Sequence, residues 1–500
     1  MVTNILEYLE KTVAEVPDKV AFSDGTDSLT FAGLYAAARR GGSYLIEQGI
    51  VREPVMVIMD KHPRELAAFF AVIYAGGFYV PVDADMPPLR MAAIAETTGP
   101  RFVICDSRNR ANAEKIPGTT VITYEELTAC EPDEIALRDV REHQLDTDPI
   151  YIVFTSGSTG VPKGVLACHR SVIDYTENLS AALGFGRDNV FGNQTPLYFD
   201  APLKEIMPTL KFGATTYLIP KQLFMFPVRL VEYLNEHRIN AVCWVVSALT
   251  MISALGTLDK VKPEYLTTVA FGSEVFPKKQ YGIWRAALPD ATFYNLYGPT
   301  EATGMSCFWR ADRELGEDEP IPVGRPFRNT RIYLIGEDGA PVRRGEVGEI
   351  YIGGSCVTMG YYANPEKTEQ AFVVNPTVSA WRDIVYRTGD MGRYNEYGEL
   401  VFVSRRDYQI KHMGHRIELG EIEAAADRLD GVARSCALYD SERRRIRLFY
   451  MGTAEETQLS SYLRDYLPRY MLPNEIKRLP RLPLTSNGKL DRRALESENK

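Results

Sequence analysis

The sequence predicts an α/β protein with two domains: a large, multi-lobed amino-terminal domain and a small, mobile α+β domain at the carboxyl end. Three observations support this prediction. A chain of 500 residues exceeds what one compact core usually supports. Up to about residue 380, helical-looking segments alternate with short apolar runs, which is typical of largely parallel sheets. Beyond that point the pattern changes to short strands separated by turn residues.

The apolar runs of the first part are the expected strands of the parallel sheets. Each run is short, bounded by polar or turn residues, and rich in Val, Ile, Phe and Tyr. They occupy residues 51–60, 76–83, 101–106, 151–157 and 240–248.

A β-rich lobe is expected next, from residue 345 to about 406, because its strand-like pieces are joined by Gly, Asn and Asp. After it, residues 418–431 and 456–467 read as helices, and residues 433–440 and 444–451 read as strands. We therefore expect an amino-terminal domain over residues 1–406 and a carboxyl-terminal domain over residues 407–500.

The composition excludes several functional classes. With 45% hydrophobic and 25% charged residues, the chain fits a soluble globular enzyme. It contains no long uninterrupted apolar stretch and no apolar signal core at its start, so we expect neither membrane insertion nor secretion, and a cytoplasmic location. The net charge of −9 argues against general nucleic-acid binding. Seven widely spaced cysteines without a CxxC pair indicate reduced structural thiols.

A loop dense in hydroxyls and glycines follows the strand-like run at residues 151–155. Glycines allow backbone N–H groups to approach phosphate oxygens, hydroxyls donate further hydrogen bonds, and Lys163 supplies charge. The loop is not a Walker A motif, because Lys163-Gly164 is followed by Val165 rather than by Ser or Thr. A flexible polar surface loop is the alternative. The groups expected at phosphate are Thr155, Ser156, Gly157, Ser158, Thr159, Gly160 and Lys163.

This loop, TSGSTGVPKG, resembles the phosphate loop of adenylate-forming enzymes. Further stretches resemble the same family in the same order: YNLYGPTE at 294–301, GEI at 348–350 through GYY at 360–362, YRTGD at 386–390, RRDYQIK at 405–411 with GHRIELGEIE at 414–423, and NGKLD at 487–491. The family includes acyl-CoA synthetases, luciferases and the adenylation domains of nonribosomal peptide synthetases. The resemblance implies an AMP-forming acid–thiol ligase that uses ATP and Mg²⁺.

The resemblance also implies roles for individual residues. Lys163, Glu301, Arg405 and Lys489 would be catalytic, with Glu301 helping to hold magnesium and Asp407 serving as the hinge of the last domain. The nucleotide would further contact Gly272, Ser273, Asn295, Tyr297, Gly298, Thr300 and Asp390. Without the resemblance these residues have ordinary interpretations: Tyr297 as a core tyrosine, Asp390 as an Asx turn, Asp407 as a turn residue and Lys489 as a solvated lysine. The chain has Ser404 where the family usually has Gly.

Asp200 resembles the aspartate that binds the α-ammonium group in amino-acid-activating members. An alternative is that Asp200 caps a helix beginning at Ala201. One turn later, Lys204 could face the substrate and favour an acidic side chain, or could face outward. The approximate motif alignment assigns the rest of the pocket to Ala201, Trp244, Val269, Phe271, Leu296, Gly304 and Met305.

The resemblance therefore implies activation of an amino acid to an aminoacyl-adenylate with release of pyrophosphate, and transfer to the phosphopantetheine thiol of a carrier protein supplied in trans. D-alanine:D-alanyl carrier protein ligase is the alternative, although Phe271 stands about where those ligases have a cysteine. An acyl-CoA synthetase disagrees with Asp200. A catalytically dead relative disagrees with the presence of Lys163, Glu301, Asp390, Arg405 and Lys489.

Overall fold

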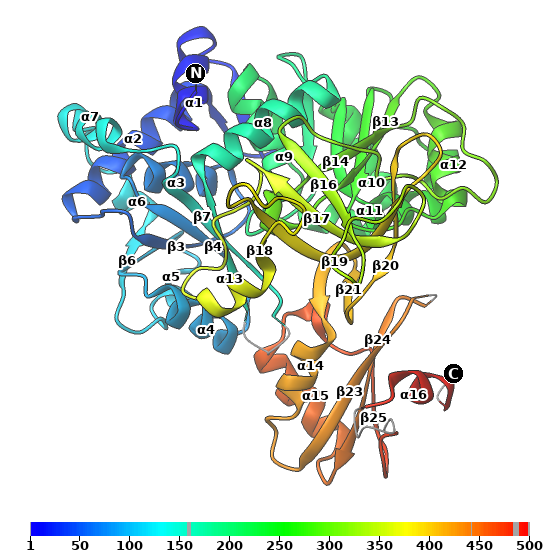
Figure 1. Ribbon diagram of the computed structural model, residues 1–500. Coiled ribbons are helices and arrows are strands. Elements are labelled where there is room, and N and C mark those ends of the chain that lie inside the picture. Colours follow the sequence, from blue (N-terminus) through cyan, green and yellow to red (C-terminus); the bar gives the residue numbers. More distant parts are fainter. Residues whose placement is uncertain (1, 158–161, 442, 484–489, 499–500) are drawn as a thin grey trace. The chain divides into compact units, whose positions relative to one another are not determined.

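The computed structural model describes residues 2–157, 162–441, 443–483 and 490–498 (Figure 1). The chain divides into two compact units. Unit 1 comprises Met1–Ala84, Thr98–Val153 and Gly164–Arg406. Unit 2 comprises Asp85–Thr97, Phe154–Lys163 and Asp407–Lys500. Unit 2 thus takes in two segments that lie far earlier in the chain than residue 407.

The largest sheet of unit 1 has nine strands, of which the six central ones run parallel. An antiparallel strand lies beside each end of this parallel group. In spatial order the strands are β15 (Arg325–Pro326), β14 (Cys307–Arg310), β13 (Thr292–Tyr297), β12 (Thr268–Gly272), β11 (Ala241–Val245), β9 (Val190–Asn193), β10 (Thr215–Leu218), β1 (Val20–Ser23) and β2 (Ser28–Thr30).

A second sheet has six strands, and its pairs β3–β4, β3–β5, β4–β7 and β5–β6 are all parallel. Its strands are, in order, β6 (Thr120–Thr123), β5 (Phe102–Cys105), β3 (Pro54–Met59), β4 (Phe78–Asp83), β7 (Pro149–Thr155) and β8 (Lys163–Cys168). Every residue of β3 is buried. A strand covered on both faces needs a continuous apolar run rather than an alternating one, and this explains the run seen in the sequence.

Helices cover the sheets and create two large apolar clusters. The first cluster joins the two sheets and receives α1 (Leu6–Glu15), α2 (Phe31–Glu47), α3 (Pro63–Tyr74), α8 (His169–Leu183) and α9 (Leu203–Phe212). The second cluster consists of residues from strands β9 to β14 and from helices α10 (Pro227–Glu236), α11 (Val246–Ala254) and α12 (Lys278–Ala287). The shorter elements are α5 (Arg110–Ala113), α6 (Tyr124–Leu127), α7 (Glu134–His143), η1 (Lys221–Met225), η2 (Thr257–Asp259) and η3 (Thr300–Ala302).

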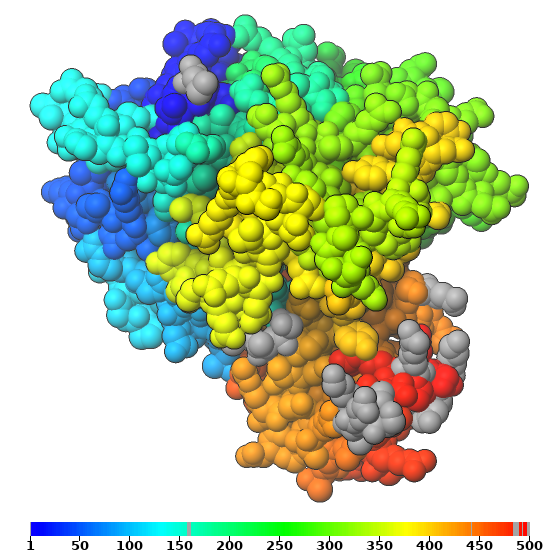
Figure 2. All heavy atoms as spheres, in the orientation of Figure 1, coloured from blue at the N-terminus to red at the C-terminus, as the bar shows by residue number. Residues whose placement is uncertain are grey.

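The β-rich lobe of unit 1 is an antiparallel sheet of five strands. It comprises β16 (Thr330–Ile335), β17 (Gly348–Gly354), β18 (Phe372–Val374), β19 (Ile384–Tyr394) and β20 (Leu400–Arg405), with helix α13 (Pro365–Ala371). Its atoms, yellow-green to gold, are prominent on the face shown in Figure 2. The predicted α/β architecture with parallel sheets and a β-rich lobe is confirmed.

Unit 2 has a core of its own. Residues Ile417, Ile422, Leu448, Leu459 and Met471 belong to one buried cluster. Around it lie the hairpin β21 (Gln409–His412) and β22 (His415–Glu418), the sheet of β23 (Val432–Asp440), β24 (Arg445–Gly452) and β25 (Glu475–Arg478), and helices α4 (Pro88–Thr98), α14 (Leu419–Ala426), α15 (Glu456–Tyr466), η4 (Arg469–Met471) and α16 (Arg492–Glu498). This is an α+β unit.

Candidate active site

Three residues singled out for nucleotide binding come together at one point of unit 1. Asp390 on β19 lies directly opposite Arg405 on β20 in the antiparallel register. Its Oδ1 pairs with Arg405 Nη1 at 2.6 Å, and its Oδ2 accepts a hydrogen bond from the Tyr297 hydroxyl at 2.6 Å. Arg405 also donates to the carbonyl of Thr388 at 3.2 Å. Asp390 is therefore a strand residue in a charged network, and its interpretation as an Asx turn is wrong.

The burial of this network keeps Tyr297 protonated. Burial raises the pKa of Tyr297 well above its ordinary value, and the neighbouring Asp390 carboxylate raises it further. Tyr297 thus acts as a hydrogen-bond donor, while its ring packs in an apolar cluster with Ile350 and Leu400. A carboxylate has about four lone-pair positions, so Asp390 can still accept hydrogen bonds from a ligand.

Glu301 lies on η3 and is fully buried, with an exposed fraction of 0%. Its Oε1 accepts a hydrogen bond from the hydroxyl of Tyr361 at 2.7 Å. No group of three or more His, Cys, Asp or Glu side chains that could hold a metal occurs within the described ranges. Mg²⁺ commonly binds through one or two carboxylates together with substrate phosphates, so a single buried glutamate fits that ion. Asn295, also predicted at the nucleotide, donates to the carbonyl of Pro322 at 2.8 Å.

Two glycines of the predicted site are required by close backbone contacts. A Cβ on Gly298 would lie 2.5 Å from the Cα of Met305, and one on Gly272 would lie 2.5 Å from the carbonyl oxygen of Leu296. Ser273, which follows Gly272, has a backbone φ of 68°, a value that residues other than glycine rarely adopt. Backbone strain of this kind is often found at functional sites.

A second group of polar side chains surrounds Asp200, and we call it the Asp200 cluster: Asp200, Tyr151, Tyr175 and Lys204. A Cβ on Gly304 would lie 3.6 Å from both Asp200 Oδ2 and the Tyr175 hydroxyl oxygen, so these two groups border the same small volume. Burial raises the pKa of Asp200, while Lys204 and a hydrogen bond from Thr300 oppose that rise. Asp200 also contributes to the raised pKa of Tyr151, after burial itself.

The hydroxyls of Tyr151 and Tyr175 are buried and have no hydrogen-bond partner among the described residues. A buried hydroxyl without a partner costs free energy, about 1–3 kcal/mol, so such groups usually serve a ligand or a water. The sequence prediction missed both tyrosines. Tyr151 lies in an apolar strand and Tyr175 on an amphipathic helix, where each reads as an ordinary core residue.

The start of α9 corrects the helix-cap interpretation of Asp200. The helix begins at Leu203 rather than at Ala201, its N-cap is Pro202, and no side chain caps it. Backbone hydrogen bonds from Leu203 to Asp200 and from Lys204 to Ala201 form the turn before the helix. Asp200 is thus held at the end of a loop with its carboxylate available for other contacts.

Three predicted pocket residues point elsewhere. Trp244, Val269 and Phe271 belong to the second apolar cluster, on the α10–α12 side. Their strand neighbours Cys243 and Ala270 belong to the first cluster. The first cluster also contains Tyr175, Leu203, Leu296 and Met305.

Successive strand residues point to opposite faces, so an alignment displaced by one residue selects the wrong face of the sheet. Cys243 and Ala270 also lie opposite one another in the register of β11 and β12. On β11 it is therefore Cys243 rather than Trp244, and on β12 Ala270 rather than Phe271, that belongs to the first apolar cluster together with Tyr175. Lys204 affects the pKa of Cys243, in agreement with this placement.

The phosphate loop belongs to unit 2 in its described part. The Ser156 hydroxyl donates to the carbonyl of Arg416 at 2.9 Å, and the Gly157 N–H donates to Glu421 Oε2 at 3.0 Å. Lys163 Nζ lies 3.9 Å from Glu418 Oε1. Thr155 donates to the Lys163 carbonyl at 3.5 Å.

The same unit contains a buried ion pair between Arg90 and Glu421. Within unit 2, therefore, the carboxylates of Glu418 and Glu421 contact the Lys163 ammonium and the Gly157 N–H, two groups that are predicted to bind phosphate. Asp407 is exposed and accepts a hydrogen bond from the Gln409 N–H at 3.2 Å. Ser158, Thr159, Gly160 and Lys489 lie outside the described residues.

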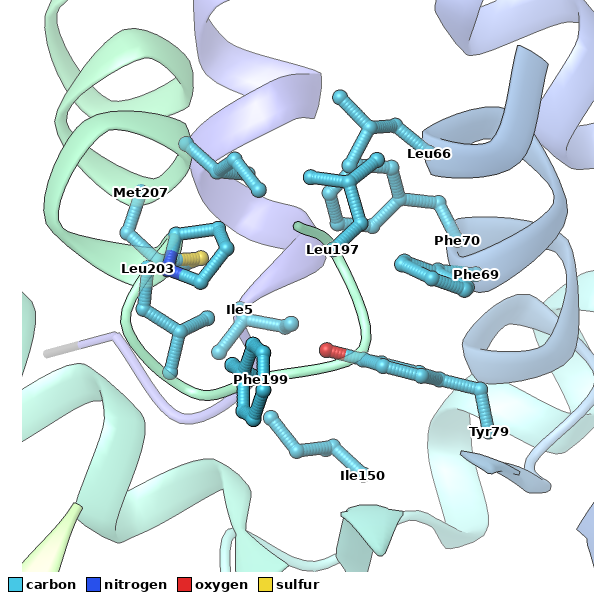
Figure 3. A pocket seen from close by; sticks show the side chains of 12 residues that line it. Ile5, Leu66, Phe69, Phe70, Tyr79, Ile150, Leu197, Phe199, Leu203 and Met207 are labelled. Atoms are coloured by element: carbon cyan, nitrogen blue, oxygen red, sulfur yellow. The ribbon is translucent and has the colours of Figure 1, made fainter. Parts of the chain in front are cut away.

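A small apolar cavity adjoins the segment that carries Asp200 (Figure 3). It measures about 20 Å³, which suits one water-sized molecule and not an amino acid. Phe199 and Tyr79 face each other across it, and Tyr79 stacks on Phe69 with ring centroids 4.2 Å apart. Neither Asp200 nor Tyr175 lines this cavity, so it is separate from the Asp200 cluster.

The comparison with protein families decides the family. A model described as AMP-binding enzyme matches residues 9–362. The chain belongs to the AMP-binding enzyme family. The predicted resemblance to adenylate-forming enzymes is thereby confirmed, and so is the enzyme class of AMP-forming ligases. Membership also implies use of ATP. None of the described helices is long and apolar enough to cross a membrane.

Relatives and solved structures extend this finding. The "L-proline--[L-prolyl-carrier protein] ligase" of Streptomyces coelicolor is 31% identical and matches 98% of this chain and 96% of its own length. Malpinin synthetase of Mortierella alpina is 33% identical over 97% of this chain, which spans only 6% of that protein.

Among solved structures, IdnL1 has a TM-score of 0.83 with 26% identity and covers 97% of this chain, which in turn covers 99% of it. The holo-PA1221 structure, a nonribosomal peptide synthetase protein containing adenylation and PCP domains, has a TM-score of 0.85 with 25% identity over 99% of this chain and 84% of its own.

Proposed function

We propose that this AMP-binding family member activates the carboxylate of an amino acid with ATP and passes the aminoacyl group to the phosphopantetheine thiol of a carrier protein supplied in trans. The observation that supports an amino acid is the Asp200 cluster. A carboxylate beside two buried, unpartnered hydroxyls suits a small ligand with a cationic group and hydrogen-bonding capacity. A fatty acid offers no such group, which argues against an acyl-CoA synthetase.

In the first half-reaction, a carboxylate oxygen of the amino acid attacks the α-phosphorus of ATP, and the bond to pyrophosphate breaks. Asp200 holds the α-ammonium group and thereby orients the carboxylate. Asp390 accepts hydrogen bonds from ribose hydroxyls while Arg405 remains paired with it. Glu301 would hold Mg²⁺, which balances charge on the phosphate oxygens. Ser156, Gly157 and Lys163 are assigned to phosphate, and Lys489 to the charge that develops during attack.

In the second half-reaction, the thiol attacks the carbonyl carbon of the adenylate and AMP leaves. The carrier protein is supported by the relatives: the Streptomyces coelicolor ligase is named for a prolyl-carrier protein, and holo-PA1221 contains a PCP domain. We further propose that residues 407–500 act as a mobile domain hinged at Asp407. D-alanine loading of a carrier protein remains the alternative within the same reaction class.

Amino-acid-dependent exchange of pyrophosphate into ATP tests the proposal. We expect exchange that requires ATP, Mg²⁺ and one α-amino acid from panels of L and D amino acids. Exchange with D-alanine as the best substrate would favour the alternative. Absence of exchange with every amino acid, together with CoA-dependent turnover of a fatty or aryl acid, would refute amino acid activation.

A further inference from the structure

A lysine at the end of a strand of the six-stranded sheet holds the start of the loop that carries Asp200. We call residues 194–202, which connect β9 to α9, the Asp200 loop. Lys61 follows β3, and its Nζ donates to the carbonyl oxygens of Asn193 and Gln194 at 3.0 and 3.1 Å. Asn193 is the last residue of β9, so both hydrogen bonds lie where the strand ends and the loop begins.

A third hydrogen bond from Lys61 reaches the neighbouring strand of the nine-stranded sheet. Its Nζ also donates to the carbonyl oxygen of Ile219 at 3.3 Å, and Ile219 directly follows β10. An ammonium has three N–H donors, so backbone oxygens use all of them. Burial lowers the pKa of Lys61 to about 7, and the charges of Glu205 and Glu65 oppose that fall. The ammonium is therefore a poorly hydrated cross-link between the carboxyl ends of β3, β9 and β10.

Glu205 holds the other end of the Asp200 loop. It lies in the first turn of α9, has an exposed fraction of 1%, and its Oε2 accepts a hydrogen bond from Asn193 Nδ2 at 3.3 Å. Burial raises the pKa of Glu205 to about 7, and the nearby Lys204 ammonium opposes that rise. Asn193 thus connects the residue before the loop with the helix after it, while Lys61 holds the backbone of the same Asn193.

The apolar contacts of the Asp200 loop are incomplete. Leu197 and Phe199, both in the loop, line the cavity of about 20 Å³ described above (Figure 3). Side chains that border a void lose the dispersion contacts that would otherwise hold them. No side chain caps α9, the helix that follows the loop. The polar anchors at the two ends therefore have a large share in fixing the loop.

We propose that Lys61 and Glu205 are positioning residues for Asp200: they fix both ends of the Asp200 loop and thereby set the place of the carboxylate that receives the α-ammonium group. The inference rests on the proposed function, because it takes Asp200 as the ammonium partner. Open α/β sheets bind ligands beside the carboxyl ends of their strands, so the cross-link lies where small displacements affect binding. A displacement of about 1 Å can cost about 100-fold in rate.

Lys61→Met tests the anchor at the start of the loop. The substitution keeps the apolar stem of the side chain and removes its three N–H donors. With the amino acid that wild-type enzyme uses best, we expect kcat/KM for pyrophosphate exchange to fall about 10- to 100-fold, chiefly through KM for the amino acid. KM for ATP should not change. Lys61→Arg, which keeps a cation with several N–H donors, should restore most of the affinity for the amino acid. An unchanged KM for the amino acid in Lys61→Met overturns the inference.

Lys19→Met is the matched control. Lys19 is half-buried, as Lys61 is, and its Nζ also donates to backbone carbonyls, those of Arg187 and Gly213. Gly213 is the C-cap of α9, so these hydrogen bonds lie at the opposite end of the helix from the Asp200 loop. We expect Lys19→Met to lower thermal stability and to leave KM for the amino acid unchanged. An equal rise of that KM in Lys19→Met would mean that any damage beside α9 has this effect, and would overturn the inference.

A double variant keeps the inference testable if Lys61→Met does not fold. Removing one of two facing buried charges leaves the other uncompensated, whereas Lys61→Met/Glu205→Gln removes both. We expect the double variant to fold and to show the raised KM for the amino acid. A wild-type KM in the folded double variant overturns the inference and leaves the proposed function standing. Absence of exchange with every amino acid in the wild-type enzyme overturns the proposed function itself.

Discussion

At the residue scale, the polar groups of the Asp200 cluster that lack a hydrogen-bond partner support the proposal that it binds a ligand. Tyr151 and Tyr175 each have a buried hydroxyl without a partner, and Lys204 has a buried ammonium without one among the described residues. Folding does not usually leave three such groups together, because each one costs free energy. A polar ligand that pairs with all of them recovers that cost.

Asp200→Asn tests the role of the carboxylate while preserving its shape. We expect kcat/KM for amino-acid-dependent exchange to fall about 10- to 150-fold, because a hydrogen bond to a charged group contributes about 1.5–3 kcal/mol. Binding of ATP, measured by calorimetry, should change little. Asp146→Asn is the control, since Asp146 forms a surface pair with Arg170. Near-normal exchange in Asp200→Asn would show that Asp200 does not bind the ammonium group.

At the scale of elements, helix α8 is anchored by a neutral histidine at its first position. His169 has an exposed fraction of 1%, and its Nδ1 accepts a hydrogen bond from the Ile5 N–H at 3.2 Å. Burial lowers the pKa of His169 to about 3, and the charge of Arg141 acts in the same direction. The segment before α1 is therefore tied to α8 by an acceptor that must stay unprotonated.

This histidine predicts a loss of stability in acid. The unfolded chain binds a proton near pH 6.5 and the folded chain only near pH 3, so the contribution of His169 is complete above pH 6.5 and is lost as pH falls toward 3. Between pH 6.5 and 5 we expect about 1–2 kcal/mol of this loss. His169→Gln, whose amide cannot be protonated, should show a flatter dependence of the unfolding midpoint on pH. The exposed His143 supplies the control His143→Gln, and equal slopes in all three proteins would contradict the assignment.

Also at the scale of elements, the register of a strand decides on which face of the sheet each of its residues lies. The sequence predicts β11 as a strand within residues 240–248, although it predicts none for β12, and it does not say which face of β11 belongs to which apolar cluster. Cys243 and Trp244 look equally suited to a core or a pocket from composition alone. Only the pairing of Cys243 with Ala270, and their membership of the first apolar cluster, decides the question.

At the scale of the whole molecule, residues 407–500 belong to unit 2, which has an apolar core of its own. The proposed role of this segment can therefore be tested separately. The resemblance assigns Lys489 to the charge that develops on the phosphoryl oxygens. Removing one preorganised donor typically lowers a rate about 10²- to 10³-fold. We expect Lys489→Ala to lose adenylate formation by that factor.

The second half-reaction distinguishes movement from simple damage. Transfer from supplied aminoacyl-adenylate to the carrier thiol should survive much better in Lys489→Ala, because the hinged domain is proposed to remove this lysine before transfer. Single-turnover assays of each half-reaction make the comparison, with circular dichroism to confirm folding. Equal losses in both half-reactions would contradict a movement about Asp407.

The sequence by itself determined the family, the order of the motifs, the α/β architecture with its β-rich lobe, and Asp200 as the candidate ammonium partner. These features are carried by local signals: Gly and hydroxyl residues in one loop, apolar runs of strand length, and short motifs whose residues are adjacent in the chain. Such signals can be recognised without knowing what lies across the core.

Tertiary structure alone decided the surroundings of the site. It joined Tyr297, Asp390 and Arg405 over a separation of 93 residues between the first two, and it brought Tyr151 and Tyr175 to Asp200. It also turned Trp244 and Phe271 away and buried Lys204. The physical reason is that hydrogen-bond satisfaction, burial and the face of a strand depend on partners distant in the chain, and no local pattern encodes them.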